Sequence, residues 1–397
     1  MVKEVNEMVD EMSPRENFKR IMSFRKPDRM LWMEGQLDTT LLNWIRQGLP
    51  LDRVVRTSYD VLVNGAITVV MPMPYTLDAS GYFGFLPIIP QDGTIELDFG
   101  PLPRNVQRIL RESGEKVLCA TPLGGKMEYS RIEYAMPHFV EFPVQNMKDW
   151  REFKKRFNPA DLRRYPKDYT SEQYITLFEE LTGPTTLVIT GFYAFGRAMM
   201  GTAAFTPAFY VDSELVRDMM DTYADFLVEV MKEAVETLKS RIDWVFWYED
   251  LAHGVGPNIS PRLFKDFILP NLKKVTGFLN KNGIDLVIMD CDGNFGALMP
   301  LLWEGGIRGA LPLEVNAGID AVQLRKQYGR TWRFIGNIDK RELPKGEQAI
   351  RREVDRRVPW LKEDGGYIPA LDHEVPPNVS LKDFTFYADY LKSVLND

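Results

Sequence analysis

The sequence has few of the residues that build cross-linked or membrane-spanning proteins. Its 397 residues include two cysteines, Cys119 and Cys291, and three histidines. Two cysteines are too few for a disulfide framework, and no apolar run is long enough to span a bilayer. Residues 1–20 are charged and do not read as a secretory signal. We therefore expect a cytoplasmic protein that does not associate with membranes.

The sequence also lacks a basic stripe and the common nucleotide and nucleophile motifs. The formal net charge is -7 and the pI is about 5.3, whereas a nucleic-acid-binding protein would carry a basic face. There is no GxSxG turn, no P-loop, and no GxGxxG at a first βα turn. These absences disfavour nucleic acid as a partner, and also hydrolase triads, kinases and dinucleotide oxidoreductases.

From residue 170 onward, strand-like and helix-like segments alternate with short loops. Such alternation predicts a parallel sheet, because each crossover helix must cover it. The number of units favours one (β/α)8 TIM barrel domain over residues 1–397, although an open sheet fits the same pattern. The expected strands are 185–190, 244–248, 284–289, 309–313, 331–336 and 366–369, with helices at 171–182, 212–240, 261–282, 295–304, 319–328, 347–361 and 381–395. Residues 191–197, Gly-Phe-Tyr-Ala-Phe-Gly-Arg, are expected to form a loop after the first of these strands.

The N-terminal half is less regular. Ser13, Pro14 and Glu16 form a capping-box pattern that predicts a helix to about Phe24, within an N-terminal helical extension at 1–28. Prolines and glycines are dense after residue 62, and short alternating runs appear at 94–99, 116–120 and 129–134. This pattern predicts an irregular insertion at about 65–135 that contains β-hairpins.

Carboxylates and one histidine follow three of the expected strands. Glu249 and Asp250 follow strand 244–248, Asp290 and Asp292 follow strand 284–289, and His373 follows strand 366–369. In a barrel the strands end at a common face, where active sites are found. We therefore expect these three strand ends to meet in one site.

Three interpretations of this acidic cluster remain open. Glu249, Asp292 and His373 could ligate Zn²⁺ through oxygen and nitrogen atoms and leave one position open for a substrate. One buried carboxyl could instead have a raised pKa and act as a general acid. The acids could also only cap the helices that follow, for which Asp292 is well placed. Cys291, between two acids, is expected to be a poor nucleophile.

Several ordered motifs resemble the uroporphyrinogen decarboxylase superfamily. The opening Ser13–Arg20, followed by Lys26–Arg29 and Trp32, is similar to the start of its members. The C-terminal half resembles a branch of methyltransferase-like proteins linked to corrinoid-dependent demethylation. The motifs that carry this resemblance are Tyr248–Asp250, Ile259–Phe264, Asp290–Asn294, Leu313–Gly318, Gly336–Lys340, Gly365–Pro369, Asp372-His373 and Pro376-Pro377. The resemblance implies a (β/α)8 barrel.

The sequence departs from two activities of that superfamily. Decarboxylases carry an arginine-rich segment after the first strand, whereas this chain has Glu34 there. An acid-lined site would repel a polycarboxylate substrate. Zinc methyltransferases of the superfamily use a His-x-Cys pair and a later Cys, whereas this chain has Asp290-Cys291-Asp292 and His373. The resemblance then implies harder ligands, and a methyl donor rather than a thiol acceptor.

The resulting prediction is a methyltransferase that moves a methyl group from a small donor to the Co(I) of a separate corrinoid protein. An aryl methyl ether is the expected donor, which makes the chain an O-demethylase component. The predicted substrate contacts are Tyr193, Phe195, Arg197, Trp247, Tyr248, Glu314 and Asn337. A methylated or quaternary amine is the alternative donor. The sequence also leaves two other functions open, a decarboxylase and a non-catalytic ligand-binding barrel. For the oligomeric state we consider a homodimer.

Overall fold

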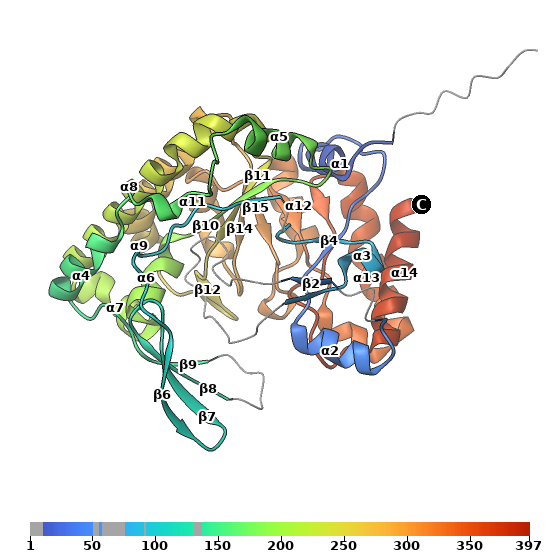
Figure 1. Cartoon of the computed structure of the whole chain (residues 1–397). Helices are drawn as coiled ribbons and strands as arrows, with labels where there is room; N and C mark the ends of the chain where they lie inside the picture. The colour runs from blue at the N-terminus through green and yellow to red at the C-terminus, as the bar shows by residue number, and fades with distance from the viewer. Residues whose placement is uncertain (1–10, 51–54, 58–75, 91–92, 131–136) are drawn as a thin grey trace, which may run out of the picture.

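The computed structural model describes residues 11–50, 55–57, 76–90, 93–130 and 137–397 (Figure 1). The first ten residues of the predicted extension and part of the predicted insertion lie outside these ranges. No helix in the described ranges is long and apolar enough to cross a membrane.

The central element is a parallel sheet in the order β17-β16-β15-β14-β11-β10-β5. Every neighbouring pair in it is parallel, as the alternation of strands and helices predicts. The predicted α/β class is therefore confirmed. The strands are β5 (Thr94–Ile95), β10 (Thr186–Thr190), β11 (Trp244–Tyr248), β14 (Val287–Asp290), β15 (Gly309–Leu311), β16 (Arg333–Ile335) and β17 (Tyr367–Ile368).

A second parallel pair, β1 (Met33–Glu34) with β4 (Leu86–Pro87), lies next to β17. The backbone N–H of Met33 donates to the carbonyl of Pro369, just after β17, at 3.0 Å. Among the described strands β4 and β5 are not paired. Strand pairing therefore extends the sheet beyond β17 but does not by itself close a barrel.

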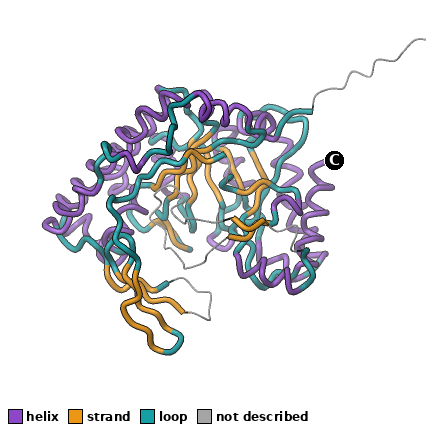
Figure 2. Tube along the Cα trace, viewed as in Figure 1, coloured by secondary structure: helices purple, strands orange, loops and turns teal. Residues whose placement is uncertain are grey.

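Helices surround the sheet, with α8 on one side and α13 and α14 on the other (Figures 1 and 2). A short π-helical turn at Phe264–Ile268 joins α9 to α10, so that they run as the single helix predicted at 261–282. The helices are α1 (Pro14–Met22), α2 (Asp38–Arg46), α3 (Ser80–Phe83), α4 (Met147–Phe153), α5 (Glu172–Glu180), α6 (Phe192–Met200), α7 (Thr202–Val211), α8 (Ser213–Leu238), α9 (Pro261–Leu263), α10 (Leu269–Lys281), α11 (Met299–Glu304), α12 (Ala321–Tyr328), α13 (Glu347–Asp364) and α14 (Leu381–Asn396).

The inner face of the sheet carries its own apolar cluster. Val188, Phe246 and Ile288 are in register on β10, β11 and β14 and belong to one buried cluster with residues of β1, β15, β16 and β17. Helix α1 adds Phe18, whose ring centroid lies 5.8 Å from that of Trp244. The predicted capping box of α1 is formed by Ser13 and Glu16. This helix therefore covers the interior at the amino ends of the strands.

The alternate residues of the same strands face the helices. Leu187, Val245 and Met289 are fully buried in a larger cluster between the sheet and the helices. Each such aliphatic side chain contributes about 1.5–3 kcal/mol of burial free energy relative to an exposed one. Because both faces of the sheet are apolar, β10 and β11 are nearly continuous runs of hydrophobic residues.

The described part of the insertion contains a four-stranded antiparallel sheet that projects from the body of the molecule (Figure 1). Its hairpins agree with the prediction, and every residue of β6 is exposed. The predicted bounds of the insertion are wrong: the run at 94–99 supplies β5 of the central sheet, and the antiparallel sheet ends with a strand beyond residue 135. Its strands are β6 (Arg108–Ser113), β7 (Lys116–Ala120), β8 (Lys126–Ser130) and β9 (His138–Glu141); the remaining short strands are β2 (Val55–Thr57), β3 (Thr76–Asp78), β12 (Ala252–His253) and β13 (Gly256–Pro257).

Candidate active site at the carboxyl ends of the strands

A row of polar residues ends the inner face of the sheet. Thr190, Tyr248 and Asp290 are in register on β10, β11 and β14, two positions beyond the apolar row of Val188, Phe246 and Ile288. Because side chains alternate along a strand, the two rows face the same side. The Thr190 hydroxyl is buried and has no hydrogen-bond partner among the described residues. The apolar interior therefore gives way here to groups able to bind a polar atom.

Asp290 is the acid in this row. Within the described part of the chain, no hydrogen bond or ion pair of its carboxyl group is found. Burial, followed by repulsion from Asp292, raises the pKa of Asp290 well above its usual value, and His373 only partly offsets this. Its carboxyl therefore retains its proton to a higher pH than that of an exposed aspartic acid. Asp290 was not among the predicted catalytic residues. The sequence could have identified it, because a residue two positions after Ile288 faces the same side of the strand.

Asp292 and His373 come together as predicted. The His373 Nε2 lies 3.5 Å from an Asp292 carboxylate oxygen, and both side chains are partly exposed. The backbone N–H of Glu374 donates to His373 Nδ1 at 2.8 Å, which places the ring proton on Nε2, toward Asp292. The Asp292 contact raises the pKa of His373. Burial raises the pKa of Asp292, but His373, Lys340 and Arg197 together outweigh burial and lower it.

The turn after Asp292 is held close to the loop that follows β11. Gly293 has φ +74°, and a Cβ there would lie 2.6 Å from the backbone carbonyl of His253. The N–H of Asn294 donates to that carbonyl at 3.0 Å, and the Asn294 side chain accepts from the N–H of Gly296. Asn294, rather than Asp292, therefore accepts a hydrogen bond from the first residue of the helical turn that follows.

Glu249 is buried at the N-terminus of α6, a helix formed by residues that were expected to be a loop. Its carboxylate accepts hydrogen bonds from the backbone N–H groups of Tyr193 (3.3 Å) and Ala194 (3.0 Å), and from the Trp247 indole at 3.5 Å. A carboxylate satisfies the free N–H groups at a helix N-terminus, which explains why α6 begins there. Burial, partly offset by these hydrogen bonds, raises the pKa of Glu249 to about 7.

The predicted zinc ligands do not fit a metal ion in this arrangement. The oxygens of Glu249 are taken by α6, whereas Asp292 and His373 contact each other. In the part of the chain that the structure describes, no three side chains from His, Cys, Asp and Glu form a group that could hold a metal. Cys291 is fully buried, and burial raises its pKa well above the usual value, so its thiol is protonated.

The predicted ring contacts separate into two groups. Tyr193, Phe195 and Trp247 are fully buried in the layer between the sheet and the helices; the Phe195 ring stacks on Tyr223 at 3.9 Å. Tyr193 and Trp247 contact Glu249, but within the described residues no hydrogen bond joins any of these three to Asp290, Asp292 or His373. Tyr248 does reach the polar row.

Two cationic side chains border the acids. Arg197 forms an ion pair with Asp250, and an Arg197 guanidinium nitrogen lies 3.5 Å from the Tyr248 hydroxyl. Lys340, which the sequence did not single out, lies with its ammonium 4.0 Å from Glu314. Glu314 also accepts a hydrogen bond from the N–H of Gly293 at 2.8 Å. The acidic strand ends thus contain their own compensating charges.

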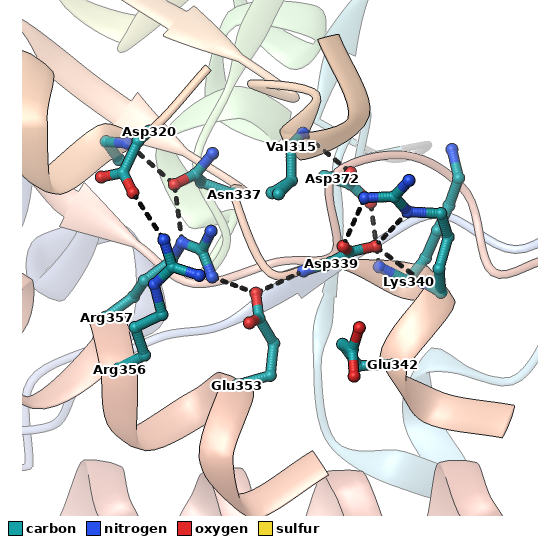
Figure 3. A network of polar contacts seen from close by, with 12 residues as sticks. Val315, Asp320, Asn337, Asp339, Lys340, Glu342, Glu353, Arg356, Arg357 and Asp372 are labelled. Atoms are coloured by element: carbon teal, nitrogen blue, oxygen red, sulfur yellow. Dashed lines mark hydrogen bonds and ion pairs between the residues drawn. The ribbon is translucent and has the colours of Figure 1, made fainter. Parts of the chain in front are cut away.

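Asn337 belongs to a saturated network behind the site (Figure 3). Its side-chain amide donates to the carbonyls of Leu313 and Ile319, and its oxygen accepts from the N–H of Ala321 and from Arg357. These four bonds leave the amide without capacity for a ligand. Asn337 therefore holds the loops after β15 and β16 together, although it was predicted to bind substrate.

Asp372 performs a similar task in the same network (Figure 3). Its two carboxylate oxygens accept from the N–H of Val315 at 2.9 Å and from the N–H of Lys340 at 3.0 Å. The network continues to Glu353, which accepts from the N–H of Asp339 and pairs with Arg357. Asp372 thereby fixes the backbone that carries Lys340.

These features define a parallel α/β protein with an acid of raised pKa and an acid–imidazole pair at the carboxyl ends of its strands. The family described as "Uroporphyrinogen decarboxylase (URO-D)" matches residues 117–394, and the chain belongs to this family. The resemblance found in the sequence is therefore confirmed. None of the curated proteins matches the chain.

The solved structures similar to the chain include a methyltransferase and a methionine synthase. The methyltransferase from Methanosarcina mazei has 12% sequence identity and a TM-score of 0.59, with 98% of this chain and 100% of that chain covered. A B12-independent methionine synthase from Shewanella sp. W3-18-1 has 12% identity and a TM-score of 0.34, with 59% of this chain and 68% of that chain covered. The first shows a shared fold; the second is too distant to carry an argument.

Proposed function

We propose that this protein is a methyltransferase that moves a methyl group from an aryl methyl ether to the Co(I) of a separate corrinoid protein. Its family membership and its fold, shared with a methyltransferase, support this proposal. The observation that carries it is Asp290, an acid with a raised pKa and no hydrogen bond or ion pair among the described residues, at the place where the apolar interior ends. In this proposal the sheet is the (β/α)8 barrel that the family implies.

The reaction needs an acid because an aryl ether has a poor leaving group. The methyl–oxygen bond breaks, the methyl group forms its new bond to the acceptor, and the bonding electron pair stays on the aryl oxygen. Asp290 gives its proton to that oxygen, so that the products are a phenol and the Asp290 carboxylate. Tyr248, in the same row, is placed to hydrogen-bond the ether oxygen. Because Glu249 is not placed to share an ion with Asp292 and His373, this step relies on the proton.

The charge balance favours a neutral donor over a quaternary amine. Asp250 pairs with Arg197, Asp292 contacts His373, and Glu249 and Asp372 accept backbone hydrogen bonds. The raised pKa of Asp290 disfavours its charged form. The acids at the strand ends are thus already compensated, and a cationic ligand would find little uncompensated negative charge.

The test uses the full chain with chemically reduced cob(I)alamin as the acceptor and 2-methoxyphenol as the donor. We expect loss of the Co(I) absorbance and formation of catechol in equal amounts. Tetramethylammonium and glycine betaine serve as alternative donors, and zinc content is measured on the same protein. Turnover with the amines but not with the ether would show that the donor is a methylated amine. No methylation from any of these donors, either to cob(I)alamin or to a cognate corrinoid protein, would contradict the proposal.

A further inference from the structure

A cluster of arginines lies at the opposite end of the sheet. Arg325, Arg330 and Arg333 place their guanidinium carbons 5.0, 5.4 and 4.9 Å from the ring centroid of Phe24. Arg333 is the first residue of β16, and Phe24 follows α1, which covers the amino ends of the strands. Three cations thus surround one aromatic ring in a chain whose net charge is -7.

The ring at the centre of this arginine cluster is held in an unfavourable conformation. Phe24 has φ +58°, a left-handed conformation that a bulky residue rarely adopts. It packs against Gly365 and Gly366, where an added Cβ would collide with Phe24. Backbone strain of this kind persists only where the surrounding structure enforces it, and it is common at ligand sites.

The positive charge of the arginine cluster is incompletely balanced. Nη1 of Arg325 lies 3.2 Å from an Asp364 carboxylate oxygen, an ion pair without hydrogen-bond geometry, and Nε of Arg325 is buried without a hydrogen-bond partner in the described structure. Arg330 donates to the carbonyl of Phe24 and Arg333 to that of Met22. Burial lowers the pKa of Arg325 to about 10, and repulsion from the other two arginines contributes. Aromatic faces compensate cations only partly.

We propose that the arginine cluster binds an oxyanion of the phosphate class, either free phosphate or a phosphomonoester. Guanidinium groups match tetrahedral oxyanions through paired N–H donors. Arg330 is exposed and Arg333 is partly exposed, so both have N–H groups within reach of a ligand, while buried Arg325 adds charge behind them. A bound anion would relieve the mutual repulsion of the three arginines. This site is at the far end of the strands from Asp290 and does not depend on the proposed methyl transfer.

The test measures binding of inorganic phosphate and of glycerol 3-phosphate to the full chain by isothermal titration calorimetry. Thermal unfolding is followed in parallel, with sodium chloride at matched ionic strength as the reference. We expect one site per chain and a rise in Tm with phosphate beyond that with chloride. The exposed members are replaced in Arg330→Gln and Arg333→Gln, for which we expect at least a tenfold weaker affinity. Tighter binding of glycerol 3-phosphate than of phosphate would indicate a phosphomonoester ligand; the reverse would indicate free phosphate.

The matched control is Arg351→Gln. Arg351 also lies over an aromatic ring, 4.4 Å from the centroid of Tyr390, but outside the arginine cluster. We expect phosphate binding by this variant to equal that of the unmodified chain. Absence of binding, or equal losses of affinity in Arg351→Gln and Arg333→Gln, would overturn the proposal and leave the cluster a structural stack.

Discussion

Two neighbouring regions at the carboxyl ends of the strands use the same residue types in opposite ways. Around Asn337 and Asp372, every side chain of the network has partners in helices and loops (Figure 3). Around Asp290, a buried acid has no hydrogen bond or ion pair among the described residues, and the Asp292–His373 pair is partly exposed. A network in which every polar group has a hydrogen-bond partner stabilises the fold, whereas an acid without partners remains available for proton transfer.

The comparison predicts its largest effect at Asp290. Asp290→Asn keeps the shape of the neutral acid but removes its acidic proton, and we expect kcat for ether demethylation to fall by roughly 10²–10⁴-fold. The free energy of unfolding should not decrease, because burial disfavours the charged carboxylate at this position and asparagine carries no charge. The measurement is phenol formation with cob(I)alamin, alongside urea unfolding. In the unmodified enzyme the rate should decline as pH rises through the raised pKa of Asp290. Full activity of the variant would contradict the comparison.

In the network around Asn337 and Asp372, a substitution is expected to lower stability. Arg357→Met leaves Glu353 buried without its cationic partner and should lower the free energy of unfolding by about 3–5 kcal/mol. The control is Arg356→Met, one residue away: Arg356 is 62% exposed and pairs with Asp320 at 3.2 Å, so its loss should change stability by about 0–1 kcal/mol. Urea unfolding of both variants measures the difference. Equal effects would show that burial does not distinguish these pairs.

A substitution of Glu249 tests whether this residue belongs to the structural network or to the reactive site. If it anchors α6, Glu249→Ala should lower the free energy of unfolding by about 1–3 kcal/mol, because the N–H groups of Tyr193 and Ala194 lose their acceptor. Thermal unfolding measures this change, and zinc analysis of the same samples separates the two roles. Loss of equimolar bound zinc with unchanged stability would restore the predicted ligand role.

A further effect is expected in the pH dependence of stability at Glu34. Burial raises the pKa of Glu34 to about 8, despite hydrogen bonds from Tyr387 and Leu371. The folded chain then retains a proton that the unfolded chain releases near the usual carboxyl pKa. Glu34 therefore contributes stability that is present below pH 4.5 and is lost as pH rises to about 8. The slope is at most about 1.4 kcal/mol per pH unit. Glu34→Gln should flatten it in urea titrations; an unchanged slope would assign the pH dependence elsewhere.

Much of the fold was predictable because local patterns agree with the tertiary structure. The strand predicted at 244–248 is β11, and the Ser13 capping box starts α1 as expected. Residues 191–197 were expected to be a loop, since nothing local indicates a helix start at Gly191. The missing cap is Glu249, more than fifty residues away. A cap supplied from another strand leaves no signal in a local pattern.

The sequence by itself determined the α/β class, the family and the meeting of Asp292 with His373. These depend on strand alternation and on the rule that parallel strands end at one edge of the sheet. Only the tertiary structure decided which acids are free. Asp290, Glu249 and Asp372 look alike in the sequence, and they differ in whether distant backbone N–H groups reach their oxygens. Hydrogen bonding and burial, which are properties of the folded chain, separate the acid proposed for chemistry from those that hold the fold.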